Sequence, residues 1–289
     1  PLPPFCGRPV PRKEGLAKVS GRASYIDDLS FPGIIYGTTV RSHVPRGIIR
    51  SISFGDGIPW GDFTIVTAKD IPGENAISLI LKDQPCLAET RINHAEEPVV
   101  LLAHHDRYLL EVARRSVSIE VDPLPPVFSI DESLSQKEIV WGDDNLLKVC
   151  EPNKGNVDQV WGGADFIVEG EYETGAQEQL YIEPNGMVAT ADDNGVTVWG
   201  SMQCPYYVQK ALMALFGFSA ERVRVVQAET GGGFGGKEEY PSMIAAHAAL
   251  LAWKSRKPVK LIYDRAEDMV ATTKRHPSRT RHRTAARKD

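Results

Sequence analysis

The chain has 289 residues, of which 42% are hydrophobic and 25% charged, with a net charge of -5 and a pI of about 5.9. This composition is ordinary for a globular protein, and the length suggests two domains. The acidic balance argues against nucleic-acid binding, and no apolar run reaches the ~18 residues of a membrane span. Because the four cysteines are scattered and no secretion signal is found, we expect free thiols and a cytoplasmic protein.

The first part of the chain is predicted to contain short strands separated by Pro and Gly. These strands cover residues 21–29, 33–42, 47–54, 63–71, 98–103 and 117–121. A helix is predicted over 106–116, with Asp106 as its N-cap. The Pro-rich stretch 123–136 predicts extended backbone at a domain boundary. We therefore expect a first domain at 1–130 and a connector at 131–160.

The second part, residues 161–289, has a more regular pattern of elements. Strands are predicted over 165–174, 186–193, 195–202, 222–229 and 258–264, with a hairpin turn at Asp192–Gly195. Helices are predicted over 204–217, ending at Gly217, and over the apolar stretch 242–255. The fold class is therefore predicted to be α+β.

The basic residues near the end of the sequence are predicted to lie on a strand. Arg279, Arg281 and Arg283 alternate with threonine and histidine, which favours a strand with a charged face over a phosphate contact. The last residues resemble one arm of a hairpin and would leave an unpaired strand edge.

The most informative segment is TGGGFGGKEE, residues 230–239, between a predicted strand and a predicted helix. Five glycines in six positions are unfavourable in backbone entropy. Such a run is expected where the backbone must approach another group closely. Consecutive free N–H groups near a helix N-terminus also suit a bound oxyanion.

The residues alone leave two nucleotide-binding interpretations of this loop open. Residues 231–237 fit the P-loop pattern, but Glu238 stands where Ser or Thr must bind Mg²⁺. Residues 231–236 also fit the GxGxxG pattern, with Asp264 near the place of a ribose-binding acid. This second pattern predicts an NAD-dependent Rossmann dehydrogenase, although few residues remain for the rest of its sheet.

The third interpretation is a resemblance that covers essentially the whole chain. TGGGFGGKE, the apolar helix after it and RKPVKLIYDRAEDM resemble the molybdenum-binding large subunit of the xanthine dehydrogenase/aldehyde oxidase family, the molybdenum hydroxylases. VPRKEGLAKVSGRASYIDDL, GAQEQLYIEPNGMVA and WGSMQCPYYVQKAL are similar to other motifs of that subunit. The resemblance implies a small α/β hammerhead-like domain at 1–130. It also implies the first part of a molybdopterin-binding mixed α/β domain at 161–289.

The resemblance further implies an oxidoreductase that hydroxylates a purine-like heterocycle. In this family a molybdenum-bound hydroxide is the nucleophile, and Fe–S clusters and FAD on partner domains or subunits take the electrons. The family subunit is more than twice this length, and its second half carries the catalytic glutamate. We therefore expect a hetero-oligomer with the remaining half of the molybdenum subunit, the Fe–S subunit and the FAD subunit. This chain alone is expected to be inactive, and the alternative is a non-catalytic scaffold fragment of the enzyme.

Site residues follow from the resemblance one at a time. The amide of Gln203 is expected to bind an oxygen ligand of molybdenum, while the pterin itself holds the metal. Phe234 and Gly235 are expected to border metal and substrate, and Gly232 and Gly233 to contact the cofactor with them. Glu238 is expected to position the substrate, and an acid at this place favours a purine-like heterocycle over an aldehyde.

Several other ionisable residues are expected to be structural. Glu178 and Glu183 belong to a family-like block, and Lys237 is expected to pair with a carboxylate or reach solvent. His104–His105 lack partners at metal-ligand spacing. His247 falls inside the apolar helix, which is typical of a core histidine.

Overall fold

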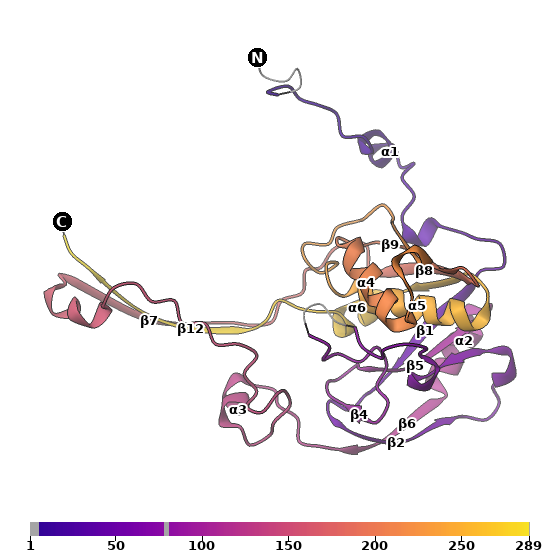
Figure 1. The fold of residues 1–289 in the computed structure, drawn as a ribbon, viewed down its shortest axis with the longest axis horizontal. Helices are drawn as coiled ribbons and strands as arrows, with labels where there is room; N and C mark the ends of the chain where they lie inside the picture. Colours follow the sequence, from indigo (N-terminus) through magenta and orange to yellow (C-terminus); the bar gives the residue numbers. More distant parts are fainter. Residues whose placement is uncertain (1–5, 78–80, 289) are drawn as a thin grey trace.

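A seven-stranded mixed sheet forms the body of the protein in the computed structural model, which describes residues 6–77 and 81–288 (Figure 1). The strand order is β10-β9-β8-β11-β1-β5-β3. The strands are β1 (Ile35–Arg41), β3 (Thr64–Val66), β5 (Pro98–His104), β8 (Gly186–Asp192), β9 (Gly195–Gly200), β10 (Val223–Gln227) and β11 (Val259–Ile262). Because β1 pairs in parallel with β11, strands from both parts of the chain share one sheet.

Helix α5 (Pro241–Ser255) lies against one face of this sheet, beside helix α4 (Pro205–Phe216) (Figure 1). Every residue from Pro241 to Ala252 is buried, as is typical of a helix that is apolar all round. Within α5, the ring nitrogens of His247 lie 3.3 Å from Thr39 Oγ1 and 3.2 Å from the carbonyl oxygen of Cys86. Burial lowers the pKa of His247 to about 3, so it is the core histidine that the sequence predicts.

The opposite face of strands β1, β3 and β5 is covered by helix α2 (Arg107–Arg115) and a small second sheet. That sheet contains β4 (Arg91–Ile92), β2 (Gly47–Phe54) and β6 (Val117–Pro123). All of β5 is buried, as expected for a strand covered on both faces. The predicted N-cap of α2 is confirmed, because the Asp106 carboxylate accepts hydrogen bonds from the backbone N–H groups of Tyr108 and Leu109.

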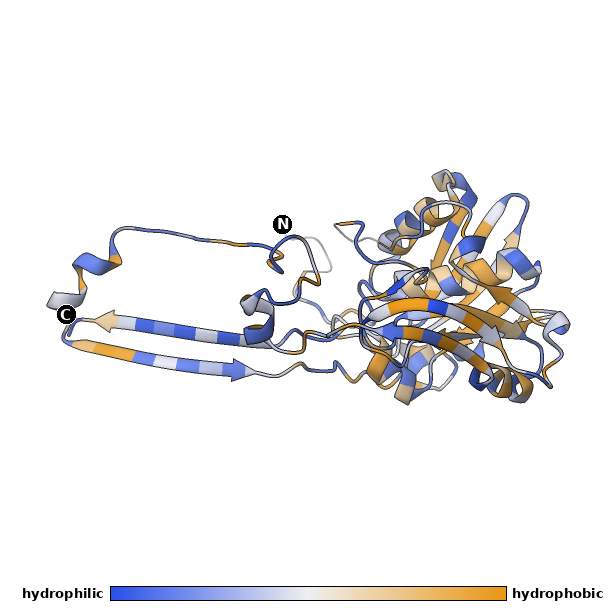
Figure 2. Cartoon of the chain, turned by 90° about the horizontal axis from the view of Figure 1, so that it is seen from below, coloured by the Kyte–Doolittle hydropathy of each residue, from blue (hydrophilic) through white to orange (hydrophobic). Residues whose placement is uncertain are grey.

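A two-stranded ribbon of β7 (Phe166–Thr174) and β12 (Ser278–Ala286) projects from the body (Figures 1 and 2). The predicted strand with a charged face is confirmed as β12. Its partner is β7, much earlier in the chain, so the prediction of a hairpin arm with an unpaired edge is wrong: the edge is paired by a distant strand. Its three arginines form cross-strand ion pairs at 2.6, 3.0 and 2.6 Å: Arg279 with Glu173, Arg281 with Glu171 and Arg283 with Glu169.

Three local predictions are wrong. The strand predicted over 63–71 ends at Val66, because the Asp70 carboxylate accepts from the Thr67 N–H and stabilises a 3₁₀ turn at Ala68–Asp70. Residues 21–29 do not form a strand, because the Asp28 carboxylate accepts from the Tyr25 N–H and stabilises a 3₁₀ turn at Ile26–Asp28. The stretch 123–136 is not extended throughout. Its prolines end at Pro126, and a capping box between Ser129 and Glu132 starts helix α3 (Ile130–Ser135).

Besides α3, two helices have no counterpart among the predictions. A short helix, α1 (Gly15–Val19), lies near the N-terminus. Helix α6 (Arg265–Ala271) begins where the Asp264 carboxylate accepts from the Glu267 N–H. Over the described ranges, no helix combines the length and apolar character needed to cross a bilayer.

Arg41 joins the two parts of the chain at the end of β1. Its guanidinium donates to the hydroxyl of Tyr263 at 2.7 Å, to Glu267 Oε1 at 3.0 Å and to the carbonyl oxygen of Glu96 at 3.0 Å. Only 6% of its side chain is exposed. Since Tyr263 and Glu267 come from the second part of the chain, this cluster fastens the shared sheet.

We predict that Arg41→Met lowers the free energy of unfolding by about 3–5 kcal/mol, because the partners of a buried charge are left unpaired. Urea denaturation measures the change. The matched control is Arg50→Met, which removes an exposed arginine paired with Asp122 and is expected to leave the midpoint unchanged. Equal midpoints for Arg41→Met and the unaltered chain would contradict the prediction.

Candidate functional site

The topology of the sheet brings three loop segments together at one edge. Since β9 and β10 are parallel and β8 runs against them, the ends of β9 and β10 lie beside the start of β8. Gln203 follows β9, the glycine loop follows β10, and Glu183 precedes β8. The sheet thus positions residues from distant parts of the sequence around the loop.

The tip of the glycine loop is a tight turn centred on Phe234 and Gly235. The N–H of Gly236 donates to the carbonyl oxygen of Gly233 at 2.7 Å, and the φ angles of the two central residues are 49° and 92°. Two positive φ values are typical of a type I′ turn. A bulky residue in this region of φ is strained, and such strain is found at functional sites. The turn therefore holds the Phe234 side chain outward, 79% exposed.

Close packing against the rest of the protein explains three of the glycines. A Cβ atom at any of these positions would meet a neighbouring side chain at less than 3 Å. The clashes would be Gly231 with Glu183 at 2.6 Å, Gly233 with Gln203 at 2.4 Å, and Gly236 with Tyr181 at 2.6 Å. The prediction that the backbone approaches other groups closely is confirmed, and those groups belong to this chain.

Gln203 lies against the loop tip and is bonded to it through its carbonyl group. Its Oε1 atom accepts from the N–H of Gly235 at 3.0 Å and from the N–H of Lys237 at 3.4 Å. Its backbone N–H donates to the carbonyl oxygen of Lys237 at 2.7 Å. Within residues 6–77 and 81–288, no acceptor faces its Nε2 group. The amide NH₂ of Gln203 is therefore free to donate to a bound group.

The loop itself offers further hydrogen-bond donors. In the described part of the chain, the backbone N–H groups of Gly232, Gly233 and Phe234 have no hydrogen-bond partner. Together with the Gln203 amide, they form a donor set beside an exposed aromatic ring. This arrangement suits a ligand that presents several oxygen acceptors. The sequence-predicted residues Gln203, Gly232, Gly233, Phe234 and Gly235 are thus brought together at the loop, with Gln203, Phe234 and Gly235 exposed and Gly233 buried against Gln203.

Glu238 follows the tip and is exposed, as is Glu239. Helix α5 begins only at Pro241, so Glu238 lies outside its first turn, and interaction with the helix dipole does not account for it. Among the described residues, the Glu238 carboxylate has no hydrogen-bond or ion-pair partner. It is therefore a free acceptor on the same loop as the tip.

Behind the loop, Lys237 points into the protein. Its side chain is 0% exposed, and its Nζ atom lies 2.9 Å from Glu183 Oε2 and 2.8 Å from Ser201 Oγ. Burial lowers the pKa of the Lys237 ammonium group, and the Glu183 carboxylate opposes this change. Lys237 thus pairs with a carboxylate, the first of its two predicted environments. Glu178, the other glutamate of the family-like block, lies 2.6 Å from the ammonium of Lys274.

The dinucleotide interpretation does not match the fold. The antiparallel hairpin of β8 and β9 lies between β10 and β11, so the loop does not connect neighbouring parallel strands. Asp264, the predicted ribose-binding acid, caps α6 instead. The four cysteines are free thiols, as predicted.

Comparisons with known proteins identify both parts of the chain. Residues 142–289 match the molybdopterin cofactor-binding domain, and residues 20–125 match the a/b hammerhead domain of aldehyde oxidase and xanthine dehydrogenase. The chain is 31% identical over 290 residues to the nicotinate dehydrogenase large molybdopterin subunit of Eubacterium barkeri, covering 98% of this chain and 67% of that subunit. It is 33% identical over 278 residues to a probable xanthine dehydrogenase subunit of Bacillus subtilis, covering 95% of this chain and 37% of that protein.

Solved structures with the same fold include two oxidoreductases. The aldehyde oxidoreductase of Desulfovibrio desulfuricans has a TM-score of 0.84 at 21% identity, over 96% of this chain and 33% of its own. The quinoline 2-oxidoreductase of Pseudomonas putida 86 has a TM-score of 0.82 at 22% identity, over 96% of this chain and 37% of its own. The predicted hammerhead and cofactor-domain architecture is confirmed.

The length comparison corrects one expectation. The family subunit was expected to be more than twice as long as this chain. The B. subtilis relative fits this expectation, because the chain spans 37% of it. The E. barkeri relative does not, because the chain spans 67% of it. The chain belongs to the aldehyde oxidase and xanthine dehydrogenase family, and it is part of the large subunit of a molybdopterin-dependent oxidoreductase, a molybdenum hydroxylase.

Proposed function

We propose that the glycine loop is the cofactor-facing and substrate-facing element of an enzyme that hydroxylates a purine-like nitrogen heterocycle. One observation carries this proposal. The free amide of Gln203 and the exposed ring of Phe234 lie at the tip of the loop, where the N–H groups of Gly232, Gly233 and Phe234 have no partner among the described residues, and the carboxylate of Glu238 is on the same loop.

The donor set fits a molybdopterin. When bound, this cofactor supplies the oxygen nucleophile and takes up the electron pair. The Gln203 Nε2 group would donate to an oxygen ligand of the metal, because Oε1 of the same amide is held by the Gly235 N–H. The N–H groups of Gly232 and Gly233 would bind further cofactor oxygens. Phe234 and Gly235 would border the substrate and exclude water from it.

Glu238 and Phe234 support a heteroaromatic substrate. A planar ring can stack on the exposed Phe234 side chain, and a ring N–H or amide N–H can donate to the free Glu238 carboxylate. Two of the similar proteins are named for nitrogen heteroaromatic substrates, nicotinate and quinoline. A third is named for aldehydes, which makes an aldehyde the competing substrate class.

We propose that the enzyme is a hetero-oligomer in the cytoplasm. Fe–S clusters and FAD on partner domains or subunits would receive the electrons, and the remainder of the molybdenum subunit would supply the catalytic base. Both similar curated proteins are named as subunits, and the chain spans only part of each. The four free cysteines suit a reducing compartment.

Two substitutions at Gln203 separate support of the loop from contact with the cofactor. Gln203→Glu keeps an acceptor for the Gly235 N–H but removes the NH₂ donor. We therefore expect a thermal unfolding midpoint close to that of the unaltered enzyme and a kcat reduced about a hundredfold. Gln203→Ala removes both groups and is expected to lower the midpoint as well. Full turnover by the Gln203→Ala enzyme in the assembled complex would instead support the non-catalytic scaffold alternative.

Glu238→Gln is predicted to lower kcat/KM for a purine-like heterocycle about ten- to hundredfold, because a charge-assisted hydrogen bond is weakened. The same change should have little effect on an aldehyde, which offers no N–H donor. Steady-state kinetics with both substrate classes measures the difference. Glu239→Gln removes the neighbouring exposed carboxylate and is the matched control. Equal effects of the two substitutions would contradict the role of Glu238.

A further inference from the structure

We infer that Lys237 and Glu183 are positioning residues, which hold the glycine loop from behind and set the place of its tip. Neither side chain needs to touch cofactor or substrate. The inference rests on the proposed function only for its consequence in catalysis, since the contacts that carry it lie within this chain.

A single carboxylate oxygen holds both ends of the glycine run. Glu183 Oε2 accepts from the N–H of Gly231 at 2.7 Å, from Ser201 Oγ at 2.6 Å and from Lys237 Nζ at 2.9 Å. Gly231 is the first glycine of the run, and Lys237 directly follows the last. Glycine has the greatest backbone freedom of any residue, so a five-glycine segment fixed at both ends is far more restricted than one fixed at neither.

Lys237 connects this support to Gln203. Its side chain bonds to Glu183 and Ser201, while its backbone N–H and carbonyl groups bond to the side chain and backbone of Gln203. Gln203 Oε1 in turn accepts from the Gly235 N–H at the tip. A chain of hydrogen bonds therefore leads from the Glu183 carboxylate to the turn that carries Phe234.

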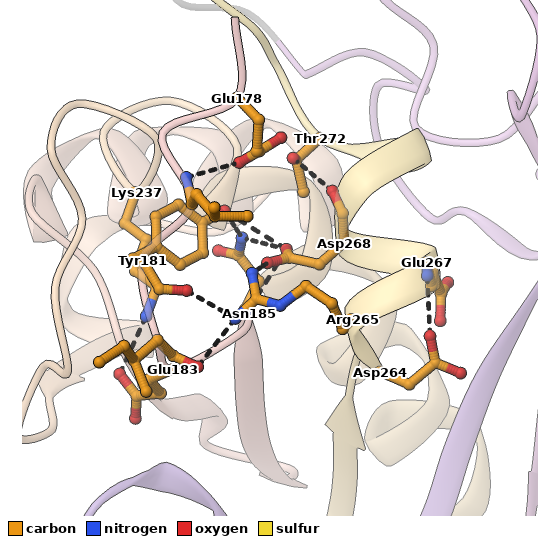
Figure 3. Close-up of polar contacts among 12 residues, drawn as sticks. Glu178, Tyr181, Glu183, Asn185, Lys237, Asp264, Arg265, Glu267, Asp268 and Thr272 are labelled. Atoms are coloured by element: carbon orange, nitrogen blue, oxygen red, sulfur yellow. Dashed lines mark hydrogen bonds and ion pairs between the residues drawn. The ribbon is translucent and has the colours of Figure 1, made fainter.

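Tyr181 forms the wall against which this part of the loop packs. Lys237 Nζ lies 4.7 Å from the centre of its ring, and a Cβ atom at Gly236 would clash with the same ring. The Tyr181 hydroxyl accepts from Asn185 Nδ2 at 2.7 Å and lies 3.3 Å from Asp268 Oδ1, as Figure 3 shows. The wall is thus itself held by buried hydrogen bonds from helix α6 and from the start of β8.

Stability alone does not account for this polar wall. Four buried side-chain oxygens have neither a hydrogen-bond nor an ion-pair partner among the described residues, and three of them lie in this wall: Gln179 Oε1, Glu183 Oε1 and Asn185 Oδ1. The wall also contains the ion pair of Arg265 with Asp268 at 3.5 Å. Unpartnered buried polar groups destabilise a protein, and buried ion pairs often contribute less than apolar packing. A cluster of them beside the loop instead points to control of the loop's geometry.

Hydrogen–deuterium exchange on the full chain tests the inference without the cofactor. For Glu183→Gln and Lys237→Met, we expect exchange of the hydrogen-bonded loop amides, those of Gly231, Gly235 and Lys237, to accelerate by about tenfold or more, with exchange in α5 unchanged. Lys260→Met is the matched control, because Lys260 is also a buried lysine but bonds to Asp27, away from the loop. Unchanged exchange in the loop, or equal acceleration in loop and α5, would overturn the inference.

A milder variant covers the case in which these substitutions prevent folding. Ser201→Ala removes one of the three donors to Glu183 and leaves the ion pair in place. It is expected to accelerate exchange of the same loop amides several-fold. Exchange identical to that of the unaltered chain would overturn the inference.

The same variants in the assembled enzyme distinguish this inference from the proposed function. If loop exchange accelerates and both the molybdopterin content and kcat fall about tenfold or more, both stand. If loop exchange accelerates but molybdopterin content and kcat are unchanged, the positioning contacts stand and the loop is not the cofactor-facing element.

Discussion

The close approach of a side-chain-free backbone to Glu183, Gln203 and Tyr181 is the constraint on which the site depends. At three positions of the loop, a single added methyl group would displace these neighbours. Because the glycines permit this approach, the N–H of Gly231 donates to Glu183 Oε2 and the N–H of Gly235 donates to Gln203 Oε1. The tip of the loop then turns outward. Glycine here provides proximity rather than flexibility, since the hydrogen bonds restrict the freedom that the residue type allows.

Because of this close approach, the glycine loop has one side facing the protein interior and one side facing outward within a few residues. Lys237 is buried among polar groups, whereas Phe234, three positions earlier, is exposed in a strained conformation. The sheet supplies the rigid base: β8, β9 and β10 place Glu183, Gln203 and the loop at one edge, and the buried helix α5 anchors the end of the loop. A cofactor-binding surface on such a rigid base needs little reorganisation when its ligand binds. Hydrogen-bond donors that are held in place in this way are more effective than donors that must first be ordered.

The sequence predicts most of the regular elements because their signals are local. The N-cap at Asp106, the αL residue Gly217 after α4 and the alternating arginines of β12 each appear where their patterns indicate. Local patterns do not reveal the parallel pairing of β1 with β11 or the pairing of β7 with β12, because these depend on contacts between distant segments. The same holds for the site. The glycine run predicts close approach but not the partner, and the role of Glu183 becomes visible only when the fold places it 2.7 Å from the Gly231 nitrogen.

Native mass spectrometry with metal analysis, on the protein purified from its own source, tests the central claim most directly. The account predicts that this polypeptide is isolated with the rest of its molybdenum subunit, with stoichiometric molybdenum and molybdopterin and with Fe–S and FAD partners. A preparation that contains this chain without metal or pterin, or with bound NAD, would contradict it.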